Sequence, residues 1–203
     1  MGTLEDPNQR LPTDWSRDGR FVVYSAPDPR TRFDIWYAPA PAGRIDASAA
    51  TKVVATTAVE SQGQLSPDGK WLAYASADSI VGDVYVRSFP TGSTVWRVTT
   101  NGAADPRWRA DGRELYFATL EDVGVSFWAA PVESTGADAF RTSAPQKLFE
   151  QPAIGYNIQS NLWTYSPSPD GKRFLVNRAT DAGLPTLNVI TNWQRSVQPL
   201  IGH

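Results

Sequence analysis

Short apolar stretches separated by polar turns recur along the whole chain, and none has the period of a helix. Runs such as "RFVVYS", "KWLAYAS", "RELYFAT" and "KRFLVN" are rich in aromatic and β-branched residues, which favour strands. Several runs, such as "WLAYA", are apolar at successive positions, which indicates that both faces of the strand are buried. The pattern predicts an all-β fold of short strands covered on both sides.

An Asp-Gly pair followed by a basic residue precedes each of these runs. The four aspartates are Asp18, Asp68, Asp111 and Asp170. Glycine reaches positive φ without steric cost and aspartate tolerates it, so each pair predicts a tight hairpin between two strands. The same hairpin therefore recurs at intervals of roughly 40 to 60 residues, a period typical of repeat proteins.

Further strand-like runs follow each hairpin and complete the repeat. A second run stands in all four repeats and a third in the first three: "DIWYAPA", "DVYVRSF", "SFWAAPV", "TLNVITNW"; "TKVVATT", "TVWRVTT", "PQKLFEQ". Four-stranded antiparallel units at this period predict a β-propeller of about four four-stranded blades. We expect one segment, 1–203, with blades at about 10–57, 58–100, 101–152 and 153–203. The alternative is a plain β-sandwich.

The stretch "LSPDGKWLAYAS…DVYVRSFP…WRVTTNGAADPRWRADGRELYF" resembles the TolB-like propeller repeat, whose signature is a Ser-Pro-Asp-Gly turn. The resemblance covers nearly the whole chain. The order of the repeats, ending in "VITNW", is similar to the C-terminal propeller of bacterial transmembrane serine/threonine protein kinases. This resemblance implies a bacterial protein whose propeller lies in the periplasm or elsewhere outside the cytoplasm.

The number of repeats bears on whether the blades close into a ring. TolB-like propellers usually have six or more blades, and this chain carries about four. We therefore expect a partial propeller that is a piece of a larger receptor-like protein. Its open blade edges would allow it to pair with a second copy, because unpaired edges and half-buried faces favour association.

Composition removes several classes of partner. The net charge of −2 leaves no basic excess to neutralise phosphates, so nucleic acid is not expected as a partner. No apolar run approaches the roughly 18 residues needed to span a bilayer, so we expect no direct membrane contact. The chain has no cysteine, and its single histidine is the last residue, His203. Disulfides and thiolate metal sites are thereby excluded, and no cofactor is expected.

Catalytic motifs are missing from the sequence, so we expect a protein that is not an enzyme. There is no Gly-x-Ser-x-Gly, and the protein-kinase motifs and the calcium-loop pattern are also absent. A carboxylate pair such as Glu121 and Asp122 has nothing to distinguish it from a solvated loop. The turn aspartates are explained by turn formation, so neither a catalytic nor a metal site is predicted.

The loops that enter the first strand of each blade are the best candidates for ligand binding, because in propellers they line one mouth of the central channel. Residues 58–64, 100–108 and 155–166 form these loops. They supply the candidate ligand-binding residues Glu60, Asp105, Arg107, Tyr156 and Asn157. Polar groups beside aromatic rings are typical of binding sites for peptides. The alternative is that these loops only pack over the channel.

The leading hypothesis is therefore a non-enzymatic module that senses a ligand or binds a protein or peptide. One alternative is the accessory propeller of a prolyl-oligopeptidase-like hydrolase, which gates substrate to a catalytic domain. Another is a structural unit that homodimerises into a larger ring.

Overall fold

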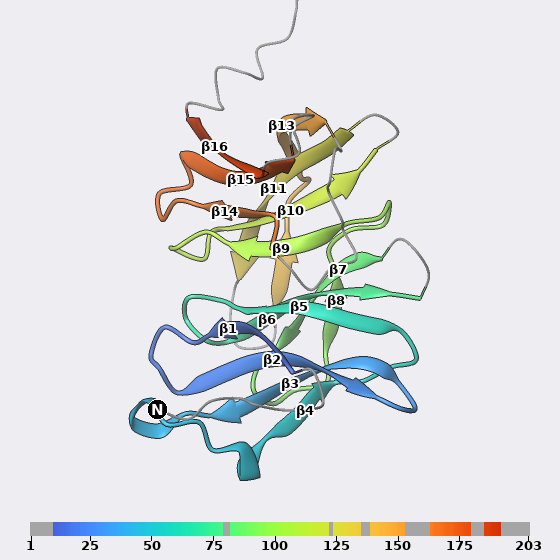
Figure 1. Ribbon diagram of the computed structural model, residues 1–203, viewed down its shortest axis with the longest axis vertical. Helices are drawn as coiled ribbons and strands as arrows, with labels where there is room; N and C mark the ends of the chain where they lie inside the picture. Colours follow the sequence, from blue (N-terminus) through green and yellow to red (C-terminus); the bar gives the residue numbers. More distant parts are fainter. Residues whose placement is uncertain are drawn as a thin grey trace, which may run out of the picture.

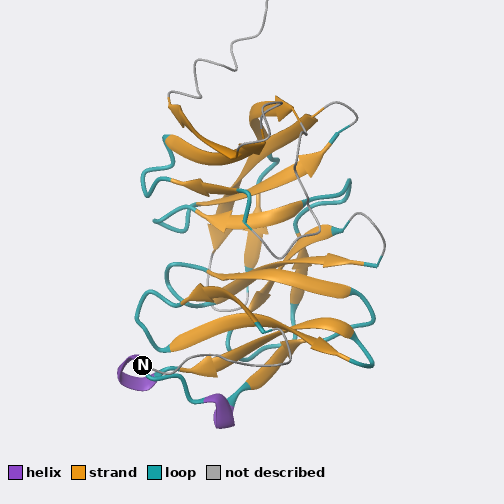
Figure 2. Cartoon of the chain, in the orientation of Figure 1, coloured by secondary structure: helices purple, strands orange, loops and turns teal. Residues whose placement is uncertain are grey.

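The computed structural model describes residues 10–78, 82–121, 124–134, 139–152, 163–179 and 185–191. Within these ranges the chain consists of strands, loops and two short 3-10 helices, η1 (Pro41–Gly43) and η2 (Ala47–Ala49) (Figure 2). Neither of these helices is long enough to cross a membrane. The prediction of an all-β fold is confirmed.

Four antiparallel sheets follow one another along the chain (Figure 1). The first contains β1 (Leu11–Trp15), β2 (Phe21–Asp28), β3 (Arg32–Pro39) and β4 (Thr51–Val54). The second contains β5 (Val59–Leu65), β6 (Trp71–Ala77), β7 (Asp83–Ser88) and β8 (Val95–Arg97). The third contains β9 (Ala104–Trp108), β10 (Glu114–Leu120), β11 (Gly124–Ser134), β12 (Phe140–Thr142) and β13 (Gln146–Pro152). The fourth contains β14 (Tyr165–Pro167), β15 (Arg173–Ala179) and β16 (Pro185–Thr191).

The third sheet has a strand that the repeat pattern does not predict. β11 pairs with β13 along its first half and with β12 at Val132, Glu133 and Ser134. The outer edge of this sheet is therefore shared by two strands. β12 also brings Phe140, which is 4% exposed, into the core between the second and third sheets.

Each Asp-Gly turn joins the first two strands of its sheet, as the repeats predict, but the aspartate plays a different part from the one expected. Only the glycines have positive φ, with values between 69° and 74°. In the second turn, Asp68 instead accepts hydrogen bonds from Ser66 Oγ (2.6 Å) and from the backbone N–H of Lys70 (3.1 Å). Ser66 Oγ in turn accepts a hydrogen bond from the backbone N–H of Trp71 (2.9 Å).

The first and fourth turns repeat this arrangement with Ser16 and Ser168. In the third turn the serine is replaced by Arg109, whose side chain pairs with Asp111 and Glu114 instead. The Ser-x-Asp-Gly turn is thus a side-chain network that fixes the hairpin, and in the third hairpin two ion pairs of Arg109 replace the bonds of the serine.

Replacing Ser66 by alanine is expected to lower the free energy of unfolding by about 1–2 kcal/mol, because the buried N–H of Trp71 loses its acceptor. Urea unfolding followed by tryptophan fluorescence measures the change. The matched control is Ser93→Ala, at an exposed loop position, which should alter stability by less than about 0.5 kcal/mol. Equal effects of the two substitutions would show that the turn network contributes nothing.

Apolar side chains fill the three spaces between neighbouring sheets. Between the first and second sheets lie Val23, Ile35, Val53, Leu65, Leu72, Tyr74 and Phe89. Between the second and third lie Trp71, Ala73, Val84, Val86, Ala103, Trp108, Leu115, Phe117 and Phe140. Between the third and fourth lie Tyr116, Phe127, Leu148, Phe149, Tyr165, Phe174 and Val176. Each middle sheet is buried on both faces, which explains why its strands are apolar at successive positions.

The sheets are stacked in an open column. The first and fourth sheets lie at opposite ends of its long axis, so the blades do not close on one another (Figure 1). On the outward side of the fourth sheet, Leu175 is 40% exposed, whereas Val23 and Tyr116, at equivalent positions of the first and third sheets, are almost fully buried. The expectation of a partial set of blades is confirmed.

Candidate functional site

The first strands of the four sheets, β1, β5, β9 and β14, follow one another along one side of the column (Figure 1). The residue six positions before the turn aspartate is Pro12 in β1, Gln62 in β5, Asp105 in β9 and, directly before β14, Thr164. The backbone bulges at this level in β1, β5 and β9, which breaks the regular pairing with the second strand. Gln62 and Asp105 consequently have positive φ, 58° and 56°. Side chains of different blades meet along this row.

Asp105 links three of the four blades. Its carboxylate accepts hydrogen bonds from Gln62 Nε2 of the second blade and from Thr164 Oγ1 of the fourth. Its backbone N–H donates to Gln62 Oε1 (2.9 Å), and its carbonyl accepts from the Tyr165 hydroxyl (2.8 Å). Asp105 is fully buried. A carboxylate held by this many donors is tightly positioned. Asp105 therefore connects the second, third and fourth blades at this level.

Arg107, two residues further along β9, has no such partners. Its Cζ lies 3.6 Å from the centre of the Trp163 ring, so the guanidinium is stacked on the indole. Its Nε is buried and has no hydrogen-bond partner among the described residues. Burial lowers the pKa of Arg107, and the nearby Tyr165, Asp105 and Asp14 oppose that shift. Arg107 is a largely buried cation that rests on an aromatic ring, and within the described part of the chain its Nε has no hydrogen-bond partner.

Asp14 of β1 is an acidic group whose charge acts on Arg107. Its carboxylate accepts a hydrogen bond from the Leu65 N–H (2.7 Å) and lines a cavity of about 140 Å³ that also contacts Gln64, Trp108 and Arg17. Burial raises the pKa of Asp14 to about 6, although the Leu65 bond and the charges of Arg107 and Arg17 lower it. Asp14 and Arg107 sense each other's charge but form no ion pair in the described structure.

Replacing Asp14 by asparagine is expected to stabilise the protein at about pH 8 by about 1–3 kcal/mol, because the folded state no longer buries a charge. The folded-state pKa of about 6 lies above the ordinary value of 3.8, so the wild type loses stability as pH rises between these values. Below about pH 3 both side chains are neutral in the folded and the unfolded state, and the difference should vanish. Urea unfolding at both pH values measures it. A gain of equal size at both would indicate a packing effect.

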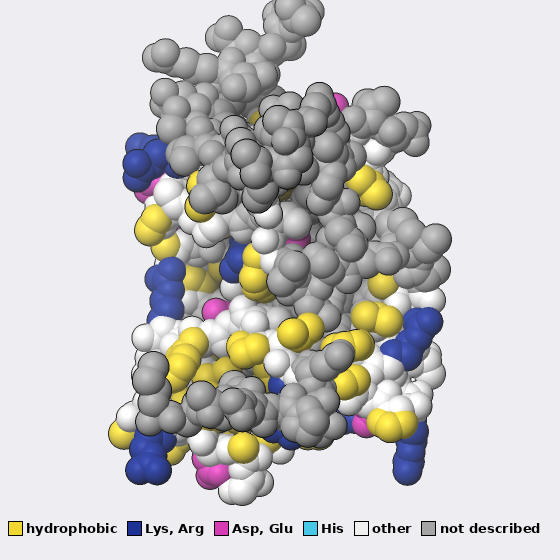
Figure 3. Space-filling view, in the orientation of Figure 1, with side chains coloured by type: hydrophobic (Ala, Val, Ile, Leu, Met, Phe, Trp, Pro, Cys, Tyr) yellow, Lys and Arg dark blue, Asp and Glu magenta, His cyan; other side chains and the backbone are white. Residues whose placement is uncertain are grey.

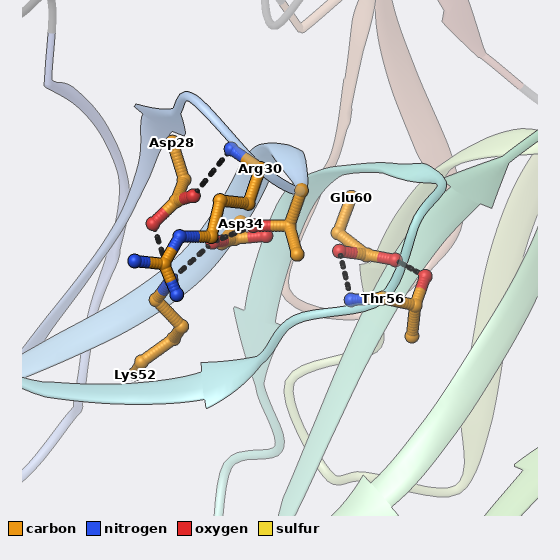
Figure 4. A network of polar contacts seen from close by, with 7 residues as sticks. Asp28, Arg30, Asp34, Lys52, Thr56 and Glu60 are labelled. Atoms are coloured by element: carbon orange, nitrogen blue, oxygen red, sulfur yellow. Dashed lines mark hydrogen bonds and ion pairs between the residues drawn. The ribbon is translucent and has the colours of Figure 1, made fainter.

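Glu60 belongs to a different cluster. Its carboxylate accepts hydrogen bonds from the backbone N–H (3.2 Å) and hydroxyl of Thr56 (Figure 4). It also accepts one from Ser76 Oγ (3.4 Å). Burial raises its pKa, and the negative charge of Asp34 adds to the rise. Asp34 itself is paired with Lys52 at 2.6 Å. No described contact joins Glu60 to Asp105 or Arg107, so its contacts tie the loop before β5 to the second blade.

Basic side chains gather along the side of the molecule where the Asp-Gly turns lie (Figure 3). The residues that follow the turn glycines are all exposed: Arg20, Lys70, Arg113 and Lys172. In the first two turns this residue is paired with the turn aspartate, at 2.6 Å and 3.9 Å. The positive charge of this part of the surface is therefore partly neutralised.

Comparison with known proteins bears on the fold. No family model matches the chain. A Bacillus subtilis protein named "Uncharacterized peptidase YuxL" is 29% identical over 127 residues, which cover 59% of this chain and 17% of that protein. TolB from Acinetobacter baumannii superposes with a TM-score of 0.65 at 15% identity, covering 91% of this chain and 41% of TolB. The β-propeller domain of the Trilobed protease from Pyrococcus furiosus superposes with a TM-score of 0.53 at 16% identity, covering 89% and 53%.

The fold is a partial β-propeller, similar to that of TolB. Each sheet is a blade. The first strands of the four blades, β1, β5, β9 and β14, together form the inner edge of the propeller. At these low identities the solved structures show the fold and not the activity. The chain spans about one-sixth of the length of the curated peptidase relative and about half or less of the two solved chains.

The five candidate residues predicted from the sequence therefore do not form one site. Asp105 and Arg107 lie side by side on the innermost strand of the third blade, and Glu60 lies apart from them. Tyr156 and Asn157 lie outside the described residues. No group of three Asp, Glu or His side chains in the described ranges is arranged to hold a metal ion.

The sequence reasoning missed Asp14, Gln62 and Thr164. Their signal was present in the repeats, because counting back six or four positions from each turn aspartate identifies the residues that share a level of the inner edge.

Proposed function

We propose that this propeller is a non-enzymatic binding module of a larger protein, and that a protein or peptide docks on its inner edge. The observation that carries the proposal is the state of Arg107. A largely buried cation is normally paired or fully hydrogen-bonded, because its desolvation is otherwise uncompensated. Arg107 rests on Trp163 without a described hydrogen bond. An Arg stacked on an aromatic ring is typical of the residues that dominate binding at interfaces.

Selection from a defined library of random peptides against the immobilised protein tests this proposal. Enriched peptides should bind the Trp163→Ala variant at least about tenfold more weakly than the wild type. The control is Leu120→Ala, which removes an apolar side chain that is 43% exposed on the third blade, and it should leave binding unchanged. Failure to enrich any peptide, or equal affinity for Trp163→Ala, would contradict the proposal.

A second candidate function is the accessory propeller of a peptidase-like hydrolase. It is favoured by the peptidase name of the Bacillus subtilis relative and by the protease that contains the Pyrococcus propeller. In this case the inner edge would contact substrate on its way to a separate catalytic domain. A Gly-x-Ser-x-Gly segment encoded after this chain in its gene would support this candidate, and its absence from the whole gene would oppose it.

The resemblance of the repeats to kinase-attached propellers supports a different parent, a bacterial transmembrane kinase with this propeller outside the cytoplasm. A kinase domain and an apolar span of about 20 residues encoded before this chain would support it. Pairing of two copies into a larger ring is the structural alternative. Light scattering behind a sizing column separates it from the others, because a monomer has a mass of 22.2 kDa and a fixed dimer twice that.

A further inference from the structure

We propose that Arg107 and Trp163 bind one carboxylate group of the ligand, at a peptide C-terminus or on an acidic side chain. The inference rests on the proposed binding function and specifies its chemistry. It depends on three features of the described structure: the free donors of Arg107, the acidic groups that surround it, and the position of Asp14.

The stacking of Arg107 leaves its donors available. A guanidinium that lies over an indole, here with Cζ 3.6 Å from the ring centre, uses its face and keeps its N–H groups in its own plane. A carboxylate matches that edge with two parallel hydrogen bonds. Nε is buried and without a described partner, so a ligand can reach only the edge formed by the two Nη groups, for which the structure describes no hydrogen bond. A carboxylate bound there would provide the hydrogen bonds and the charge that the folded chain does not supply.

The charges around Arg107 favour a ligand group with one negative charge over a group with two. Arg107 lies among the electrostatic influences of Asp105 on its own strand, Asp14 on β1 and the Tyr165 hydroxyl on β14. A phosphate dianion would be repelled by both carboxylates, and only one unpaired cation would attract it. A monovalent carboxylate pairs with Arg107 one to one. We therefore expect weak or no binding of inorganic phosphate.

The negative charge of Asp14 competes with the carboxylate of the ligand for the positive charge of Arg107. The two charges influence each other, whereas Gln64 of β5, which lines the same cavity as Asp14, is uncharged. The other charged group acting on Asp14 is Arg17 of its own turn, whose Nη1 donates to the Ala110 carbonyl (2.8 Å). When Asp14 is neutral, Arg107 has less negative charge beside it. The affinity for a carboxylate should therefore rise as the pH falls from about 8 to about 5, a range in which the ligand stays ionised.

Nuclear magnetic resonance titration of the whole chain tests the proposal, with the Arg107 Nε–H and Trp163 indole N–H signals as reporters. The probes are acetyl-triglycine with a free carboxylate, its C-terminal amide, the amidated acetyl-Gly-Glu-Gly, and inorganic phosphate. Each is titrated to about 50 mM, since a single carboxylate contact supports a Kd of about 1 mM. Saturable shifts are expected with the free acid, the glutamate probe or both, and neither the triglycine amide nor phosphate should produce them. The two carboxylate probes distinguish a chain terminus from a side chain.

Variants make the assignment specific. Arg107→Gln should weaken carboxylate binding at least about tenfold, and Asp14→Asn should strengthen it about threefold or more at pH 8 and remove its pH dependence. Arg113→Gln, an exposed arginine of the same blade, is the matched control and should change neither. The melting temperature of each variant shows whether it is folded. Asp14→Asn keeps the test valid if Arg107→Gln fails to fold.

Three results of this titration would overturn the inference. They are the absence of saturable shifts with any carboxylate probe, binding of the triglycine amide as tight as that of the carboxylate probes, and insensitivity of binding to both Arg107→Gln and Asp14→Asn. Library peptides that depend on Trp163 but bind equally well without a carboxylate would also overturn it, while leaving the proposed binding function intact. The two proposals can therefore fail separately.

Discussion

Replacing Trp71 by alanine is expected to lower the free energy of unfolding by about 3–5 kcal/mol, a large share of the stability of an ordinary domain. Trp71 is 2% exposed and lies between the second and third blades. Its ring contacts those of Trp96 and Phe140, with centroids 5.3 Å and 5.4 Å away. Alanine would leave a cavity that the flanking sheets cannot collapse to fill, because each is held by its own hydrogen bonds. Urea unfolding measures the loss.

Two controls separate packing from other effects of losing Trp71. The indole N–H of Trp71 has no described partner, so Trp71→Phe removes an unsatisfied polar group and should cost about 1–2 kcal/mol at most. Trp15→Ala removes a tryptophan that is 48% exposed and should cost less than about 1 kcal/mol. If Trp15→Ala and Trp71→Ala were equally destabilising, stacking between blades would not be the main source of stability.

Replacing Asp105 by alanine is expected to cost about 3–4 kcal/mol, because Gln62 and Thr164 lose their buried acceptor at once. The positive φ at this position adds about 1 kcal/mol of strain for alanine, which is included in that range. Since the bonds of Asp105 join the second and fourth blades to the third, their loss should also raise the rate of amide hydrogen exchange in β14. Thermal and urea unfolding, together with exchange, measure both effects.

Asparagine at position 105 provides the matched test. Its oxygen accepts from Gln62 Nε2, its amide donates to Thr164 Oγ1, and it tolerates positive φ. Asp105→Asn should therefore cost about 1 kcal/mol or less. Asp78→Ala removes an exposed aspartate and should have an effect below about 0.5 kcal/mol. A large loss in Asp105→Asn, equal to that in Asp105→Ala, would show that the negative charge matters more than the hydrogen bonds.

Much of the fold could be predicted from the sequence, because the repeat determines both the turns and the faces of the strands. The runs after Asp18, Asp68, Asp111 and Asp170 form the second strand of each sheet. The predicted role of the turn aspartate was wrong. It does not adopt a positive φ, and its side chain stabilises the turn by accepting hydrogen bonds. β12 was missed because "FRT" is too short to show periodicity.

The site was less accessible from the sequence because it depends on contacts between blades. Asp105 and Arg107 were singled out as polar residues in a loop, and they lie on a strand beside each other. Their different roles follow from their partners: Asp105 meets Gln62 and Thr164, whereas Arg107 meets the face of Trp163. The partners are far apart in the sequence, so no local sequence pattern predicts these contacts. Bulges that give Gln62 and Asp105 positive φ are likewise a product of the packed inner edge.

The four blades form an open column that does not close into a ring, and this can be measured directly. The chain lacks cysteine, so pairs of spin labels can be placed at single introduced cysteines in the four equivalent turns, at Arg20, Lys70, Arg113 and Lys172. Pulsed electron paramagnetic resonance then gives the distance for each pair of neighbouring blades and for the pair 20–172. The account predicts that the 20–172 distance exceeds all three neighbouring distances. A 20–172 distance equal to that between neighbours would show a closed four-bladed ring and contradict it.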